Sequence, residues 1–132
     1  MTTRHVAVLL LAALVLPVSA ADVSGNWRMT FKADWTSIPN LACTISQKDQ
    51  RLEGTCRGEG AQSNDKVDLA DGKIEGHEVS WTWKILVPDG VTWTFAFTDT
   101  VDPNGNAMKG IVKLSAGPGA KVNEASFTAM KQ

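Results

Sequence analysis

The chain has 132 residues, of which 43% are hydrophobic and 20% charged, with 13 basic and 14 acidic side chains. This length suits one globular domain. The scattered, nearly balanced charges contain no basic stripe of the kind that binds nucleic acid or an anionic membrane, so we expect neither as a partner.

The N-terminal segment has the features of an export signal. Arg4 supplies a basic start, the run VAVLLLAALVLPV is apolar, and Ser19-Ala20-Ala21 offers small residues for cleavage. This order is typical of a secretory signal peptide, and the apolar run is too short for a membrane span. We therefore expect residues 1–21 to be removed. Residues 22–132 would remain as a single domain, without a membrane span, in the periplasm or outside the cell.

The two cysteines lie in a segment, CTISQKDQRLEGTC, that has the pattern of a β-hairpin. A two-residue turn at Asp49-Gln50 would place Cys43 opposite Cys56 in a non-hydrogen-bonded pair, where two antiparallel chains approach most closely. Because export permits oxidation, we expect a cross-strand disulfide that stabilises the fold by about 3 kcal/mol in the chain-entropy model. The spacing does not match a CxxC-type redox pair.

Residues 79–97, VSWTWKILVPDGVTWTFAF, show the strongest alternation of apolar and polar side chains. A period of two is typical of a strand with one dry face and one wet face. A turn at Pro88-Asp89-Gly90 would pair Trp83 with Phe95, and it would place most of the aromatic side chains of this segment on one side.

Short turns join the other predicted strands. Gly76-His77 and Asn104-Gly105 favour tight hairpins, and a change of phase between Leu69 and Ile74 indicates a bulge. Eight regularly spaced strands in sequence order predict an all-β fold, an eight-stranded antiparallel up-and-down β-barrel. A two-sheet sandwich is the alternative, but its crossovers need longer connections.

Five short motifs follow one another along the predicted strands. They are Gly25-Asn26-Trp27, Leu52-Glu53-Gly54-Thr55, Val79-Ser80-Trp81, Met108-Lys109-Gly110 and Ser126-Phe127-Thr128-Ala129. Together they resemble a small exported bacterial β-barrel domain of unassigned function. More distantly, the early G-x-W is similar to that of the calycins, which include lipocalins and avidins. This resemblance implies a calycin-like barrel that binds small ligands at its loop-bearing mouth.

The predicted loops differ in length at the two ends of the barrel. Tight turns would close one end, whereas the long connections 34–40, 58–66 and 115–124 would gather at the other, where binding sites are favoured. The inward-facing side chains are bulky enough to fill the barrel, so we expect a ligand to bind shallowly at this mouth. The residues expected to contact it are Trp35, Ile38, Trp93, Trp83 and Phe95.

Catalytic chemistry has few candidate residues. After removal of the signal peptide, His77 is the only histidine, and it lies in a predicted turn. With no cluster of His, Cys and carboxylate residues, we expect no metal, no cofactor and no enzymatic activity. Asp99 is predicted to face inward opposite Gly110, where we expect its carboxyl group to reach water or a backbone donor. An enzyme that uses Asp99 with acidic loop residues is the weakest alternative.

These features favour an exported, monomeric, non-catalytic binding domain for a small apolar or aromatic ligand at the mouth. The alternative is a protein-interaction module that binds an exported protein, such as a periplasmic protease inhibitor or an enzyme accessory domain. Bacterial periplasmic metalloprotease inhibitors share an S-G-x-W start and one disulfide, but their inhibitory segment precedes the barrel. Here only Asp22-Val23 separate the predicted signal peptide from Ser24.

Overall fold

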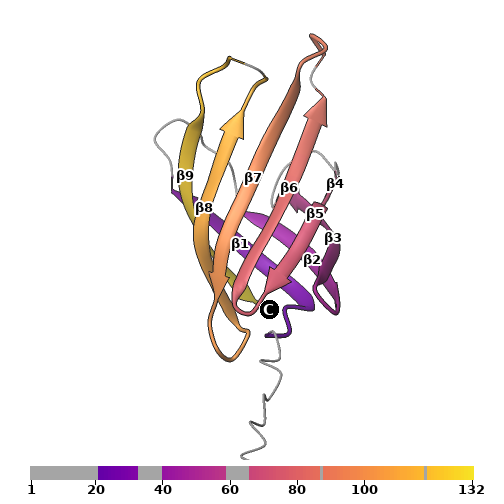
Figure 1. The fold of residues 1–132 in the computed structure, drawn as a ribbon, viewed down its shortest axis with the longest axis vertical. Helices are drawn as coiled ribbons and strands as arrows, with labels where there is room; N and C mark the ends of the chain where they lie inside the picture. Colours follow the sequence, from indigo (N-terminus) through magenta and orange to yellow (C-terminus); the bar gives the residue numbers. More distant parts are fainter. Residues whose placement is uncertain (1–20, 33–39, 59–65, 87, 118) are drawn as a thin grey trace, which may run out of the picture.

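The structure is a computed structural model that describes residues 21–32, 40–58, 66–86, 88–117 and 119–132. These residues form nine strands: β1 Gly25–Lys32, β2 Leu41–Lys48, β3 Arg51–Gly58, β4 Lys66–Asp68, β5 Ala70–Glu75, β6 Glu78–Leu86, β7 Thr92–Val101, β8 Ala107–Ser115 and β9 Asn123–Lys131. Every pairing is antiparallel, and apart from β4 and β5, which both pair with β3, neighbours in sequence are neighbours in the sheet (Figure 1). A pairing of β1 with β9 closes the ring.

The strands β4 and β5 correspond to one predicted strand. Both pair with β3, and Leu69 alone separates them. The register between β5 and β6 shifts between Ala70 and Lys73, at the position where the change of phase predicts a bulge. Counted in this way, the described residues form the closed eight-stranded antiparallel barrel that the sequence predicts.

The predicted hairpin registers are confirmed. Cys43 lies opposite Cys56 and forms the disulfide with it. Trp83 pairs with Phe95 on β7. Because the side chains of a strand alternate between its two faces, these registers direct the aromatic residues of β6 and β7 into the barrel.

The inward-facing side chains pack as one continuous core. Phe97 lies at its centre, with its ring centroid 5.0 Å from that of Trp81 and 5.5 Å from that of Phe127. The ring of Trp83 lies 4.5 Å from Phe97 on the side towards the β6–β7 turn. Aromatic contacts of this kind add to the burial of large apolar surfaces and account for much of the stability of so small a domain.

The segment before β1 covers one end of the barrel. Val23 is fully buried, and its carbonyl oxygen accepts a hydrogen bond of 2.8 Å from Nε1 of Trp27. The Nζ of Lys131 donates to the carbonyl oxygen of Asp22 at 3.0 Å. Ala21 is half-buried against the core, whereas residues 1–20 of the predicted signal peptide lie outside the described residues.

The two ends of the barrel differ. The tight turns between β5 and β6 and between β7 and β8 lie at the end where the chain enters β1, whereas the β6–β7 turn and the β8–β9 connection lie at the other (Figure 1). We call this second end the open end. Most of the predicted mouth loops 34–40 and 58–66 lies outside the described residues. Within the described part of the chain, no helix has the length and hydropathy needed to cross a membrane.

Candidate functional site

The β6–β7 hairpin projects beyond its neighbours at the open end. Pairing of β6 with β5 stops at Thr82, and pairing of β7 with β8 stops at Thr94, whereas β6 and β7 stay paired as far as Leu86. At the tip, the carboxylate of Asp89 accepts a hydrogen bond of 3.1 Å from the backbone N–H of Val91. The hairpin therefore presents its last residues to solvent on a locally ordered turn.

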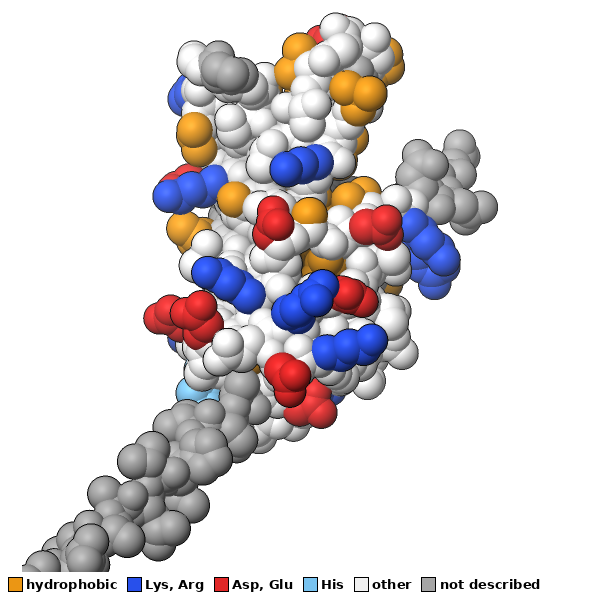
Figure 2. Space-filling view, turned by 45° about the vertical axis from the view of Figure 1, so that its right-hand side comes forward, with side chains coloured by type: hydrophobic (Ala, Val, Ile, Leu, Met, Phe, Trp, Pro, Cys, Tyr) orange, Lys and Arg blue, Asp and Glu red, His pale blue; other side chains and the backbone are white. Residues whose placement is uncertain are grey.

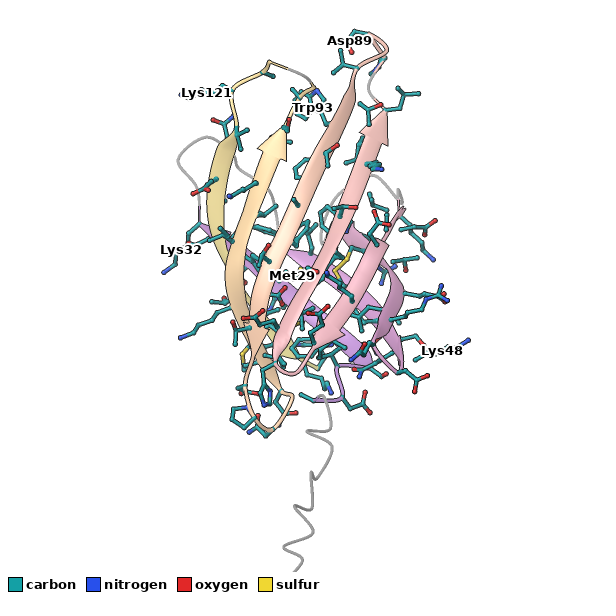
Figure 3. The ribbon with its side chains drawn as sticks, viewed as in Figure 1. Met29, Lys32, Lys48, Asp89, Trp93 and Lys121 are labelled. Carbon is teal, nitrogen blue, oxygen red and sulfur yellow. A yellow bond between two sulfur atoms is a disulfide. The ribbon has the colours of Figure 1, made fainter. Side chains whose placement is uncertain are left out.

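Large apolar side chains are exposed at this end. Leu86 is 73% exposed and Trp93 is 37% exposed, while Val122, in the β8–β9 connection, is 51% exposed. Figure 2 shows hydrophobic side chains over the tip of the hairpin. Figure 3 shows Trp93 at the same end of the barrel as Asp89 and Lys121. Leu86 pairs with Thr92 and Trp93 with Ile85, so Leu86 and Trp93 lie on opposite faces of the hairpin and offer separate apolar contacts at this end.

Burial increases along the aromatic residues from the open end into the core. Trp93 pairs with Ile85 above the pair formed by Trp83 and Phe95. Trp83 and Phe95 are only 6% and 9% exposed, and their ring centroids lie 6.0 Å apart. Of these three side chains, Trp93 is therefore the most accessible to solvent, and the rings of Trp83 and Phe95 are buried deeper in the barrel.

The structure brings three of the five expected ligand-binding residues together. Trp83, Trp93 and Phe95 lie on the paired strands β6 and β7, whereas Trp35 and Ile38 lie outside the described residues. Leu86 is not among the ligand-binding residues that the sequence predicts. Its signal was present, because the run Ile85-Leu86 places an apolar side chain at a position where the alternation requires a polar one.

One edge of the projecting hairpin carries unpaired backbone groups. The N–H of Val101 donates to the carbonyl oxygen of His77, so the odd-numbered residues of β6 direct their backbone groups towards β7. Lys84 and Leu86 therefore direct theirs to the opposite side. No strand among the described residues pairs with them there.

Asp99 is the one charged residue buried in the described part of the chain. It is 3% exposed and lies between Val79 on β6 and Gly110 on β8. The predicted inward position is confirmed. Of the two partners expected for the carboxyl group, water or a backbone donor, the backbone donor is wrong, because neither carboxylate oxygen has a hydrogen-bond partner among the described residues. Burial raises the pKa of this carboxyl to about 8. The neutral acid is the form that this apolar site accommodates.

The cysteines and the histidine are the other residues that the sequence offers for chemistry. The two cysteines are joined in a disulfide, and His77 is exposed in the β5–β6 turn. The described residues contain no group of three or more His, Cys, Asp and Glu side chains arranged to hold a metal ion. Two further polar groups of the core, Nε1 of Trp81 and of Trp83, are also buried without a partner among the described residues.

Searches against protein-family models, curated proteins and solved structures found no match to this chain. The class of protein therefore follows from its own geometry. It is a closed eight-stranded antiparallel β-barrel with one cross-strand disulfide. An exposed apolar hairpin projects from its open end.

Proposed function

We propose that this chain is an exported, monomeric, non-catalytic domain with a calycin-like barrel, which binds a small apolar or aromatic ligand at the open end. The observation that carries the proposal is Trp93, which is 37% exposed above the buried rings of Trp83 and Phe95. An accessible aromatic side chain on a rigid, packed support is a typical anchor for a ligand. The Cys43–Cys56 disulfide and the signal-like N-terminal segment support export.

A neutral fluorescent probe tests this proposal. We expect N-phenyl-1-naphthylamine to bind the wild-type protein saturably. Trp93→Ala should raise the dissociation constant by about tenfold or more, because a Trp anchor contributes about 2 kcal/mol to binding. Met130→Ala is the matched control, since Met130 is 56% exposed on β9, away from the hairpin. The proposal fails if the probe does not bind, or if both variants bind it equally. Native mass spectrometry of protein from its own source would identify a retained ligand.

A second candidate function is docking of an exported protein. It is favoured by the 73% exposure of Leu86 and by the unpaired backbone groups of Lys84 and Leu86. An extended segment of a partner could add to such an edge through main-chain hydrogen bonds. In this case Leu86→Asp, rather than Trp93→Ala, would abolish co-elution with the partner in gel filtration. Loss of partner binding in Trp93→Ala alone would argue against this function.

A further inference from the structure

Three basic side chains lie in one row across the outer face of the barrel. In the register of the sheet, Arg28 on β1 lies opposite Ala42 on β2, Ala42 lies opposite Arg57 on β3, and Arg57 lies opposite Lys66 on β4. These residues are scattered in the sequence, and only the pairing of four strands brings them side by side. We call Arg28, Arg57 and Lys66 the basic row.

The basic row borders a hollow in the outer wall. The hollow has a volume of about 430 Å³, and the small side chain of Ala42 lies between the two arginines of the row. Thr44, two residues after Ala42 on β2, and Thr55, two residues before Arg57 on β3, also line the hollow. No acidic residue is among the described residues that line it. The side chains of the basic row and of the two threonines therefore supply this hollow with hydrogen-bond donors and positive charge, and Gln132 borders it as well.

The arrangement of Arg57 and Lys66 is unfavourable by itself. The N–H of Leu69 donates to the carbonyl oxygen of Gly54, which makes Arg57 and Lys66 a non-hydrogen-bonded pair, where side chains come closest. Like charges directly opposite one another destabilise a sheet. Neither side chain has an ion-pair partner among the described residues, and Asp68, one step along β4, forms no salt bridge with them.

The wall behind the basic row is rigid. Ala42 and Arg57 are adjacent in sequence to Cys43 and Cys56, whose side chains are buried and joined in the disulfide. On the outer face, the hydroxyl of Thr44 lies 3.0 Å from Oδ1 of Asn26 and donates to it, so the amide group of Asn26 can donate to a ligand. A preorganised set of donors costs little entropy on binding.

We propose that this hollow binds a phosphate or sulfate group. Such an anion relieves the repulsion between Arg57 and Lys66 and accepts hydrogen bonds from them. The planar guanidinium group suits phosphate and sulfate oxygens because it donates in a two-pronged geometry. Arg28 completes the row on β1. This site lies on the outer face of β1 to β4 and is independent of the ligand proposed for the open end.

The test measures the unfolding midpoint as inorganic phosphate is added at constant ionic strength, with chloride as the balancing anion. We expect phosphate to raise the midpoint of the wild-type protein. Arg57→Gln and Lys66→Gln should each raise the dissociation constant for phosphate by about tenfold, because each removes charge-assisted hydrogen bonds. Lys84→Gln is the matched control, since Lys84 is exposed on β6 and should leave phosphate binding unchanged.

A second readout needs no ligand. At low salt without phosphate, Lys66→Gln should be at least as stable as the wild type, because it removes a like-charge pair. The proposal would be overturned if phosphate raised the unfolding midpoint equally in the wild type and in both row variants. It would also be overturned if chloride raised the midpoint of the wild type as much as phosphate does. Repeating the titration with sulfate and with glucose 6-phosphate shows whether the anion is recognised alone or as part of a larger molecule. Equal affinities indicate recognition of the anion alone, and tighter binding of the sugar phosphate indicates an anion carried on a saccharide.

Discussion

Asp99 on β7 lies directly opposite Gly110 on β8, and a Cβ atom at Gly110 would come within 2.6 Å of both the Cα and the Cβ atoms of Asp99. The same Cβ atom would also collide with the backbone oxygen of Thr98. The glycine therefore leaves the space that the backbone and side chain of Asp99 occupy. The buried acid and the glycine opposite it form one arrangement, which two substitutions can examine separately.

Gly110→Ala should be strongly destabilising. The new methyl group meets the backbone of β7, which cannot move without disturbing the sheet, so we expect a loss of about 3 kcal/mol or more in the free energy of unfolding. Urea denaturation measures this loss. Gly76→Ala is the control, because nothing lies within 4 Å of its Cβ position and only its φ of +60° makes alanine unfavourable. If Gly110→Ala costs no more than Gly76→Ala, the packing described around Asp99 is wrong.

Asp99 should make the protein less stable as the pH rises. Burial raises its folded-state pKa from 3.8 to about 8, so its protonated form is favoured in the folded state. The stabilising contribution is fully present below the unfolded pKa and is lost as the pH rises through the folded one. Between pH 5 and 8 the free energy of unfolding should fall by as much as about 1.4 kcal/mol per pH unit.

Asp99→Asn separates this effect from other titrations. The amide cannot ionise, so the variant should match the wild type near pH 3, below the unfolded pKa of 3.8, and exceed it in stability by a growing margin as the pH rises towards 8. The measurement is urea denaturation at several pH values, with Asp71→Asn as a control because Asp71 is exposed. Parallel pH profiles for the wild type and Asp99→Asn would show that the carboxyl group is solvated in the folded protein.

The disulfide should contribute about 3 kcal/mol, because it closes a short loop in the unfolded chain. Cys43→Ser combined with Cys56→Ser is expected to lower the free energy of unfolding by this amount, in a barrel that still folds. Thiol labelling followed by mass measurement reports the bond directly. Two labels on the denatured wild type without reductant would contradict the disulfide.

Val23 should matter to stability although it precedes the first strand. It is fully buried, and the preceding residue, Asp22, lies beside Gly105 in the β7–β8 turn. Val23→Ala should cost about 2 kcal/mol, because it leaves a cavity in a packed core. Ser46→Ala on the exposed face of β2 should cost far less. A mature chain should therefore retain Val23, and N-terminal sequencing of the exported protein checks this.

Local patterns in the sequence account for most of the fold. The alternation and the turn residues predict the register of Cys43 with Cys56 and of Trp83 with Phe95, because a hairpin depends on residues close in sequence. The basic row was not predictable, since Arg28, Arg57 and Lys66 meet only through pairings between separate hairpins. The isolation of the Asp99 carboxylate also escaped prediction, because it depends on the surroundings of the side chain in three dimensions.

The indole N–H resonances of the tryptophans provide the most direct test of binding at the open end. In a titration with N-phenyl-1-naphthylamine followed by two-dimensional NMR, Trp93 should shift most, because it is 37% exposed. Trp27 and Trp81, each 1% exposed, should shift little. Saturable shifts of Trp93 with smaller ones at Trp83 are the result that we predict. Binding that leaves Trp93 unchanged, or the absence of any shift, would contradict the proposed site.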